Sequence, residues 1–357
     1  LQVKYEQVDD ALRRIGKLDG FELEDIVPAV APWRYRNKLE YSFGTGPDGV
    51  LVCGFHAPGR WDEIVPMTDC RLASEPANEA RERIVAWCRR EGLTAYDRKS
   101  GEGFLRNLVV REGRRTGAIQ ARLVTAPGRL DRDSLVAATA GLDGVLWTRQ
   151  DRLGETTQGG ETELLAGTER FDEELNGLRF SISSEAFFQT NTEMAEQLYE
   201  LAIDYAAPRG FERVYDLYCG IGTISLSIAP RVAEVWGLEL VEEAIADAIA
   251  GARANEIDNV HFFAGDVRLA LRELTERAGR PDVLILDPPR AGLSQKVVRR
   301  VIETSPRKIV YVSCNPTTLA PNAAQLVEAG YKLLRVRPVD MFPQTPHIEC
   351  VAELVRA

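Results

Sequence analysis

The stretch Val214-Tyr215-Asp216-Leu217-Tyr218-Cys219-Gly220-Ile221-Gly222-Thr223 joins an apolar run, a turn with two glycines and the start of an apolar helix. The two glycines let the backbone come close to a ligand, and the following helix offers its amino end. No third glycine is in register, so the turn differs from the three-glycine dinucleotide fingerprint. The pattern predicts the first strand–turn–helix unit of an α/β fold.

A second apolar run, residues 234–239, ends in Glu239, seventeen residues after Gly222. A carboxylate at this place suits hydrogen bonds from the two hydroxyls of a ribose. Taken singly, these features also fit a tight turn and a surface acid. The turn and the acid together favour a cofactor that contains a nucleoside.

Strand-like and helical segments alternate through the rest of the chain. The further strands are expected at residues 260–263, 283–286 and 308–313, and the helices at 242–255, 267–278, 294–303 and 318–329. This alternation predicts a doubly wound parallel sheet. Residues 331–337 and 348–355 have no helix between them, so we expect a hairpin and one antiparallel strand at the end of the sheet. The arrangement resembles a Rossmann-like S-adenosylmethionine-dependent methyltransferase domain.

Cys314 follows the fifth expected strand directly and precedes Asn315-Pro316. An isolated cysteine is more often a small buried hydrophobe than a reactive group. Ligands of open α/β sheets, however, bind at the carboxyl ends of the strands. The position of Cys314 beyond such an end therefore favours covalent chemistry over packing.

Five sequence blocks resemble those of RNA 5-methyluridine methyltransferases and occur in the order of that family. They are Tyr-Arg-Asn-Lys (35–38), Phe-Phe-Gln-x-Asn (187–191), Asp-Pro-Pro-Arg (287–290), Ser-Cys-Asn-Pro-x-Thr-Leu (313–319) and Met-Phe-Pro-x-Thr-x-His-x-Glu (341–349). The resemblance implies methylation of carbon 5 of a uridine in RNA. Overall similarity to the ribosomal branch favours 23S ribosomal RNA over transfer RNA.

Two other functions remain open for these residues. An amino-group methyltransferase also uses Asp-Pro-Pro, although it usually has an aromatic residue where this chain has Arg290, and it needs no cysteine. A noncatalytic RNA-folding factor on the same scaffold would need neither Cys314 nor Glu349.

The chemistry of uracil explains why Cys314 and Glu349 are the candidate catalytic residues. Carbon 5 is a poor nucleophile, and a thiolate added to carbon 6 moves electron density onto it. A base must then remove the carbon 5 proton so that the thiolate can leave. We predict that Cys314 is the nucleophile and Glu349 the base, and that the helix beginning near Thr317 lowers the pKa of the thiol.

The resemblance also implies a binding site for S-adenosyl-L-methionine. Its residues would be Gln189, Tyr218, Gly220, Thr223, Glu239, Asp266 and Asp287. Tyr218 would contact the methionine moiety, Glu239 the ribose and Asp266 the adenine, while Asp287 would lie where the methyl donor meets uracil. Thr223 stands where several relatives have Asn, and Asp266 also fits a helix N-cap.

The amino-acid composition indicates what kind of protein this is and in which compartment it works. The chain has 357 residues, of which 45% are hydrophobic and 27% charged, as expected for a globular protein of two or three domains. Its six cysteines have no paired spacing, which fits free thiols in a reducing compartment. With no membrane-length apolar stretch and no leader-like amino end, we expect a cytoplasmic monomer.

The charge distribution gives arguments both against and for RNA as the partner. The net charge of −10 argues against a nonspecific nucleic-acid binder. Residues 81–122, however, contain 11 Lys and Arg against 5 Asp and Glu, and Arg106, Arg111, Arg114, Arg115 and Arg122 are candidates for phosphate contacts. Aromatic and basic residues also mix between Trp33 and Phe43, as expected for a contact with unpaired bases. Both segments also fit solvated or core positions.

We expect three parts along the chain. Residues 1–25 would form an amino-terminal helix that packs on the catalytic domain, with Val3, Val8, Leu12 and Ile15 on one face. Residues 26–180 would form a β-rich RNA-recognition domain, and residues 181–357 the methyltransferase domain. Cys70 resembles the fourth ligand of a [4Fe–4S] cluster, which would form only if three further cysteines precede Leu1.

Overall fold

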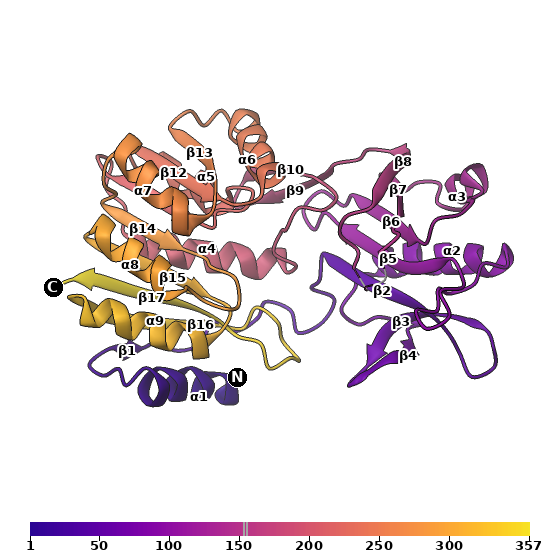
Figure 1. Cartoon of the computed structure of the whole chain (residues 1–357), viewed down its shortest axis with the longest axis horizontal. Helices are drawn as coiled ribbons and strands as arrows, with labels where there is room; N and C mark the ends of the chain where they lie inside the picture. The colour runs from indigo at the N-terminus through magenta and orange to yellow at the C-terminus, as the bar shows by residue number, and fades with distance from the viewer. Residues whose placement is uncertain (153, 155) are drawn as a thin grey trace. The chain divides into compact units, whose positions relative to one another are not determined.

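The computed structural model describes residues 1–152, 154 and 156–357, which form two compact units (Figure 1). The C-terminal unit comprises Leu1–Pro32, Leu175–Phe180 and Ala186–Ala357, and the central unit comprises Trp33–Glu174 and Ser181–Glu185. This division differs from the predicted boundaries after residues 25 and 180. Residues 26–32 stay with the C-terminal unit because the chain around Val27 forms a bridge to Val339.

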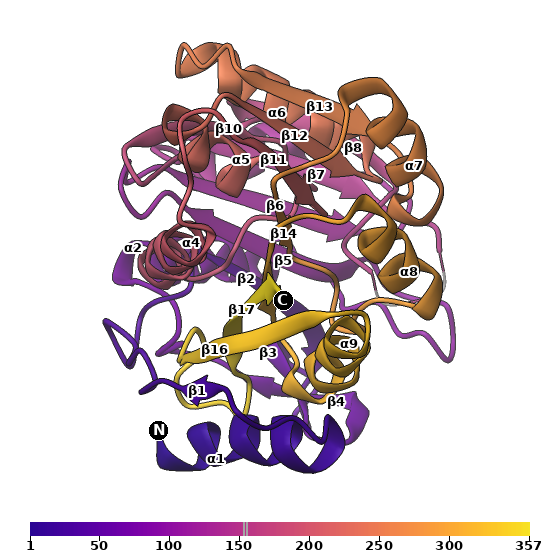
Figure 2. The ribbon, with the colours of Figure 1, turned by 90° about the vertical axis from the view of Figure 1, so that its left-hand side faces the viewer.

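The C-terminal unit is built on an eight-stranded sheet (Figure 2). Its strands are β1 (Glu22–Leu23), β11 (Arg213–Leu217), β12 (Glu234–Glu239), β13 (Val260–Ala264), β14 (Val283–Leu286), β15 (Lys308–Ser313), β16 (Tyr331–Val339) and β17 (Glu349–Arg356). The order is β1-β16-β17-β15-β14-β11-β12-β13, and only β17 runs antiparallel to its neighbours.

The terminal hairpin is present, but its predicted place at the end of the sheet is wrong. β17 returns between β15 and β16 and pairs with both. The outer strand β16 in turn pairs with β1, so the start of the chain covers that edge. A hairpin in the sequence shows that two strands are antiparallel, but not which neighbour fills the gap between them.

Helices cover both faces of this sheet (Figure 2). They are α4 (Thr192–Ala206), α5 (Thr223–Ile228), α6 (Glu242–Ala254), α7 (Val267–Ala278), α8 (Gln295–Thr304) and α9 (Pro316–Glu328). Residues of α7, α8 and α9 share one core with the sheet, and α4 packs on β14, β15 and β17. Every residue of β14 and β15 is buried, which explains the apolar runs at residues 283–286 and 309–312 and confirms the doubly wound fold.

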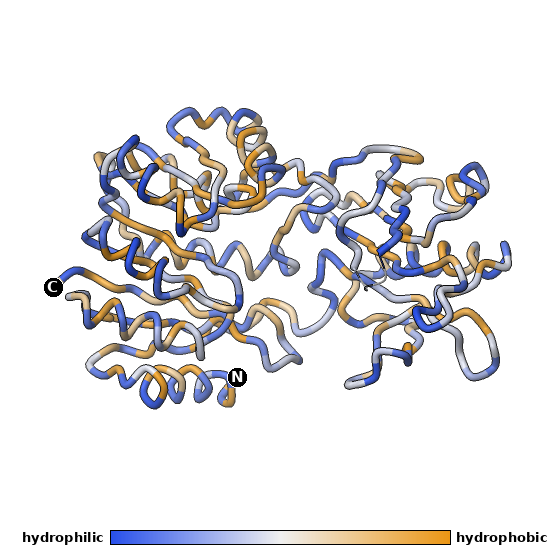
Figure 3. The backbone as a smooth tube through the Cα atoms, viewed as in Figure 1, coloured by the Kyte–Doolittle hydropathy of each residue, from blue (hydrophilic) through white to orange (hydrophobic). Residues whose placement is uncertain are grey.

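Hydropathy follows this layering. In Figure 3 the strands of the sheet carry long orange segments, whereas the helices alternate between orange and blue. Strands buried on both faces need continuous apolar sequence, and helices that cover them need only one apolar stripe. The predicted site residues Tyr218, Asp287 and Cys314 directly follow the apolar strands β11, β14 and β15.

The amino-terminal helix belongs to the same core. α1 (Gln2–Asp10) continues as a π-helical turn, η1 (Ala11–Ile15), and buries Val8 and Leu12. Val3 and Ile15 are 69% and 53% exposed, so their predicted place on the apolar face is wrong. Val3 lies five residues before Val8, about 140° around a helix, and the π turn changes the phase before Ile15.

The central unit is β-rich. Its seven strands, in the order β4-β3-β2-β5-β6-β7-β8, are β2 (Lys38–Thr45), β3 (Leu51–Ala57), β4 (Arg60–Pro66), β5 (Leu105–Glu112), β6 (Ile119–Thr125), β7 (Gly144–Arg149) and β8 (Glu161–Gly167). Helix α2 (Glu75–Arg90) packs on the sheet and on α3 (Arg132–Ala138). The hairpin of β9 (Phe171–Leu175) and β10 (Leu178–Ile182) contributes residues to both units.

Candidate active site

Cys314 and Glu349 lie opposite each other at the ends of two neighbouring strands. β15 and β17 are antiparallel, and their register pairs Ser313 with Cys350. The next position on each strand is Cys314 on one side and Glu349 on the other, so the two side chains share a face. Glu349 is buried, whereas Cys314 is partly exposed. The sheet thus brings together the thiol and the carboxyl predicted to react.

The electrostatics of the pair favour their neutral forms. Burial raises the pKa of Cys314 to about 11, with further increases from Glu349 and Asp287 and smaller opposing effects from a backbone hydrogen bond and Arg290. Burial, followed by the charge of Asp287, raises the pKa of Glu349 well above its usual range. The predicted lowering of the thiol pKa is therefore wrong for the free chain.

The amino end of α9 does not overcome this effect. Asn315 is the N-cap of α9, and its Oδ1 accepts from the backbone N–H of Thr317 at 3.1 Å. One free N–H of the helix is thereby satisfied by a side chain. The thiol instead experiences its own burial and the two neighbouring carboxyl groups.

Two further carboxyl groups lie at adjacent strands. Burial, followed by the charge of Asp216, raises the pKa of Asp287 to about 7, and burial raises that of Asp216 to about 6. Oδ2 of Asp216 accepts from the Ser225 hydroxyl at 2.6 Å. Its Oδ1 is buried and has no hydrogen-bond partner among the described residues. This concentration of carboxyl groups favours a ligand with positive charge.

The glycine turn holds Glu239 in place. Tyr218, Gly220 and Gly222 all have positive φ angles, of 66°, 54° and 80°. The N–H of Gly220 donates to Oε2 of Glu239 at 3.1 Å, and the N–H groups of Leu240 and Val241 donate to Oε1. A positive φ is costly for a residue as bulky as Tyr218, and such strain clusters at functional sites.

Asp266 lies at the end of the next strand. It is the N-cap of α7 and accepts from the backbone N–H of Arg268 at 2.8 Å, so the N-cap interpretation is correct. Burial, followed by the charges of Asp266 and Glu239, raises the pKa of Tyr218 to about 12. The ends of β11, β12 and β13 thus place Tyr218, Glu239 and Asp266 along one edge of the sheet.

Tyr199 is a polar residue of this site that the sequence did not reveal. It lies on α4, is 4% exposed, and its hydroxyl hydrogen-bonds with the side chains of Thr223 and Gln189. The charges of Asp287 and Asp216 also act on it. In the sequence Tyr199 fits the apolar stripe of a helix, and nothing marks its hydroxyl as part of a site.

A pocket of about 720 Å³ within the C-terminal unit includes Cys314 in its lining. Other lining residues are Arg290, Thr317 and His347, and the amino-terminal helix supplies one wall. The volume falls in the range of small-molecule sites. A partly exposed thiol therefore faces a space large enough for a nucleotide base.

The predicted phosphate contacts of the central unit are largely wrong. Arg106 is buried and donates to the carbonyls of Gln150, Arg152 and Gly154 at 3.0, 2.6 and 2.6 Å. Arg122 is also buried and pairs with Glu185 at 3.1 Å. These guanidinium groups support the fold, because buried charges require partners.

The same holds for much of the aromatic segment. Tyr35, Tyr41 and Phe43 are buried, and the last two belong to the core of the central unit. Trp33 remains 44% exposed, and Arg115 is exposed. Strand residues alternate between two faces, so half of a mixed aromatic and basic run points into the core.

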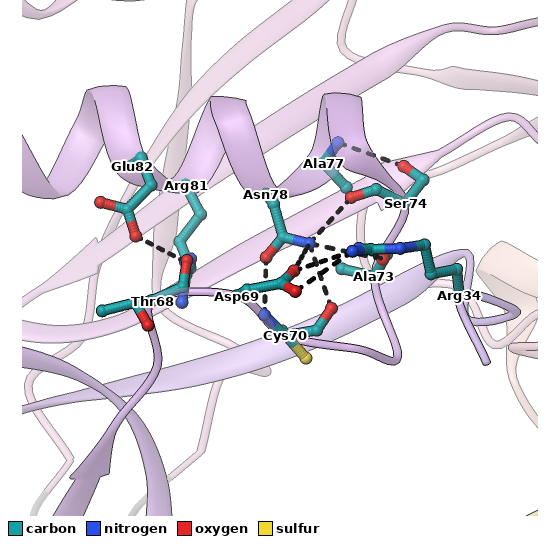
Figure 4. A network of polar contacts seen from close by, with 10 residues as sticks. All are labelled: Arg34, Thr68, Asp69, Cys70, Ala73, Ser74, Ala77, Asn78, Arg81 and Glu82. Carbon is teal, nitrogen blue, oxygen red and sulfur yellow. Dashed lines mark hydrogen bonds and ion pairs between the residues drawn. The ribbon is translucent and has the colours of Figure 1, made fainter.

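Cys70 lies in a polar network at the start of α2 (Figure 4). Asn78 accepts from the backbone N–H of Cys70 at 3.0 Å and donates to its carbonyl at 3.1 Å. The Cys70 thiol is buried near the Tyr41 hydroxyl. In the part of the chain that the structure describes, no three His, Cys, Asp or Glu side chains gather to hold a metal ion. The described residues thus do not supply the four thiolates of an iron–sulfur cluster.

Comparison with known proteins identifies the family. Residues 168–357 match the family described as tRNA (Uracil-5-)-methyltransferase. The chain belongs to this family. A protein of Porphyromonas gingivalis described as an uncharacterized RNA methyltransferase is 37% identical over the whole chain and 82% of its own length. One of Clostridium tetani with the same description is 36% identical over the whole chain and 79% of its own length.

A solved structure supports the same assignment. The Pyrococcus abyssi tRNA (uracil-54, C5)-methyltransferase, in complex with S-adenosyl-L-homocysteine, is 30% identical with a TM-score of 0.82, over 98% of this chain and 83% of its own. The protein is therefore an S-adenosylmethionine-dependent enzyme of the RNA uracil-C5 methyltransferase family. No helix in the described ranges is long and apolar enough to span a membrane.

Proposed function

We propose that this enzyme methylates carbon 5 of a specific uridine, most favourably in 23S ribosomal RNA, through a covalent adduct between Cys314 and carbon 6. One observation carries the proposal: Cys314 and Glu349 face each other across β15 and β17, beside Asp287. A thiol and a base in contact with one ring provide the two functions that the reaction requires.

The residues would act in sequence. The Cys314 thiolate forms a bond to carbon 6, and the electrons of the C5=C6 double bond move onto the ring carbonyl as an enolate. Carbon 5 then takes the methyl group, and the donor sulfonium becomes a neutral thioether. Glu349 removes the proton from carbon 5, the double bond reforms, and the electrons of the carbon–sulfur bond return to Cys314.

The raised pKa values would couple this chemistry to binding of the donor. S-adenosyl-L-methionine supplies an activated methyl group and a positive sulfonium charge. That charge would offset the carboxyl groups of Glu349 and Asp287, which favour the neutral thiol in the free chain. Neutralising them lowers the cost of the Cys314 thiolate. The nucleophile would thus be activated once the donor is present.

The predicted cofactor residues would hold the donor along the strand ends. Glu239 would accept from the ribose, Asp266 would face the adenine, and Tyr218 the methionine part. Gly220 leaves open space beside the turn, because a Cβ there would meet nothing within 4 Å. Gln189 and Thr223 would be oriented through their shared contacts with Tyr199.

Transfer RNA is the second candidate substrate, because the solved structure of the Pyrococcus abyssi enzyme is that of a tRNA methyltransferase. Mapping 5-methyluridine in RNA from cells with and without the protein tests the choice. Loss of a mark from 23S RNA would support the proposal, and loss from transfer RNA would replace it. Because all six cysteines are free, we place the reaction in a reducing cytoplasm, with the enzyme as a monomer.

RNA that contains 5-fluorouridine tests the covalent step. Fluorine at carbon 5 cannot be removed as a proton, so the methylated adduct should persist as a protein–RNA species on a denaturing gel. An amino-group methyltransferase or a noncatalytic folding factor would give no such species. Absence of the adduct from an enzyme that methylates normal RNA would overturn the mechanism.

A further inference from the structure

The amino-terminal helix forms part of the wall of the pocket that contains Cys314. Gln7, Asp10 and Arg14 line the pocket together with Cys314 and Arg290, although they are about three hundred residues away in sequence. All five belong to the C-terminal unit. The pocket thus extends beyond the groups that the uracil chemistry uses.

This wall has a fixed place in the fold. Val8, Ala11 and Leu12 are buried in the same core as Leu319, Ala320 and Ala323 of α9. Ala11 also lines the pocket, so Gln7, Asp10 and Arg14, which border the anchored face, are held beside the pocket. The wall also includes the π-helical turn Ala11–Ile15, a form that occurs frequently at functional sites.

Arg14 is available to an anionic ligand. It pairs with Asp10 at 3.1 Å, four residues earlier, and the two side chains are 78% and 64% exposed. Exposed ion pairs of this kind are weak. A phosphate offers a doubly hydrogen-bonded, charge-assisted contact instead, so Arg14 can exchange Asp10 for a phosphate at little cost.

We propose that this helix wall binds the RNA strand next to the reacting uridine, with Arg14 on a backbone phosphate. The inference rests on the proposed methylation of RNA. A uridine whose ring reaches Cys314 must be unpaired and turned out of its stack, and its neighbouring phosphates then pass the pocket wall. Buried Arg106 and Arg122 of the central unit are not available for this contact.

Arg13 provides a matched control in the same helix. It pairs with Asp9 at 2.6 Å and lies over the Phe21 ring, 4.7 Å from the ring centroid. It is not among the residues that line the pocket. Arg13→Ala and Arg14→Ala therefore remove the same charge from neighbouring positions, only one of which faces the pocket.

The experiment measures RNA affinity against salt concentration, with unmodified 23S ribosomal RNA transcribed in vitro as the probe. Arg14→Ala should weaken binding several-fold and reduce the salt slope by about 0.7, the value for one phosphate on a single strand. Arg13→Ala should change neither by as much. Asp10→Asn, which removes the competing carboxylate, should strengthen binding. Affinity for S-adenosyl-L-methionine should be equal in all three variants.

The outcomes separate this inference from the proposed function. Equal effects of Arg13→Ala and Arg14→Ala would show that only net charge matters and would overturn the inference. An unchanged salt slope for Arg14→Ala would do the same. Failure of the wild type to form 5-methyluridine would overturn the proposed function, while the comparison of the two arginine variants in RNA binding would still decide the role of the helix.

Discussion

Glu349 and Glu353 lie four residues apart on β17, and each is 4% exposed. Glu353 forms ion pairs with Lys308 at 2.5 Å and with Arg335 at 2.7 Å. Glu349 has no ion pair in the described part of the chain, and the negative charge of Asp287 raises its pKa further after burial. A buried carboxyl group with cationic partners stabilises the fold. A buried carboxyl group beside other acids lowers the stability of the folded chain, and such groups are common at functional sites.

The same contrast separates the two units. In the central unit, buried Arg81 and Arg106 donate to backbone carbonyls, and Arg122 pairs with a glutamate. At the carboxyl ends of the strands of the C-terminal unit, the charges that act on buried Asp216 and Asp287 are those of other carboxyl groups, Glu239 and Asp216. In this protein, buried charged groups that have partners therefore stabilise the fold. The carboxyl groups without cationic partners lie at the candidate active site.

The largest effect is expected at Cys314. Cys314→Ala should abolish methylation and remove the adduct with 5-fluorouridine RNA, because no other thiol adjoins the pocket in the described structure. Affinity for S-adenosyl-L-methionine should stay within about twofold of wild type. A denaturing gel and calorimetry measure the two effects. Adduct formation by Cys314→Ala would assign the nucleophile to another residue.

Substitution of the two glutamates of β17 should have different effects, on turnover for Glu349 and on stability for Glu353. Glu349→Gln should lower turnover by about 10²- to 10⁴-fold and leave a methylated protein–RNA adduct, because the carbon 5 proton stays in place. Its free energy of unfolding should not fall. Glu353→Gln should lose about 3–5 kcal/mol of stability, because Lys308 and Arg335 lose a buried charge partner.

Turnover assays and chemical denaturation of both variants test this comparison. Full turnover by Glu349→Gln would assign the base to another residue. Equal destabilisation by the two substitutions would contradict the distinction between an unpaired and a paired carboxyl group.

Asp216 should make stability depend on pH. Its pKa is about 6 in the folded chain and about 3.9 in an unfolded one, so the folded state holds the proton more tightly. The contribution of Asp216 to the free energy of unfolding is therefore fully present below about pH 4 and is lost as the pH rises through about 6. Asp216→Asn should therefore gain about 2–3 kcal/mol relative to wild type between pH 4 and pH 8.

Chemical denaturation of the cofactor-free protein across this pH range measures the difference. The exposed Asp204→Asn substitution is the control and should show no such trend, because its side chain is 75% exposed. Parallel stability curves for wild type and Asp216→Asn would contradict the effect of burial on Asp216.

The smallest effect is expected at Tyr199. Tyr199→Phe removes the hydroxyl shared by Gln189 and Thr223 and should raise the dissociation constant for S-adenosyl-L-methionine about five- to tenfold. Turnover at saturating cofactor should stay within about twofold. Tyr205→Phe removes an equally buried hydroxyl from the same helix, but Tyr205 lies against Arg335, so its cofactor affinity should not change. Equal affinities for the two variants would remove Tyr199 from the cofactor site.

Local pattern was enough to predict much of this protein. The strands and helices from Val214 onward follow from apolar runs and turns, because a doubly wound sheet requires them. The pair that we propose as reactive was also predictable, since Cys314 ends a strand and both residues stand in motifs that resemble one family. Family membership followed from these motifs and was confirmed by comparison.

Only the tertiary structure decided which charges have partners. Arg106 and Arg122 resembled phosphate contacts in the sequence, but the folded chain buries them against carbonyls and a glutamate. Tyr199 and the amino-terminal helix enter the C-terminal site from distant parts of the chain. The sequence determines where strands and helices form, since the spacing of apolar residues depends only on near neighbours in the chain. Burial and pKa depend on residues that meet only after folding, and here they decided what each charged group does.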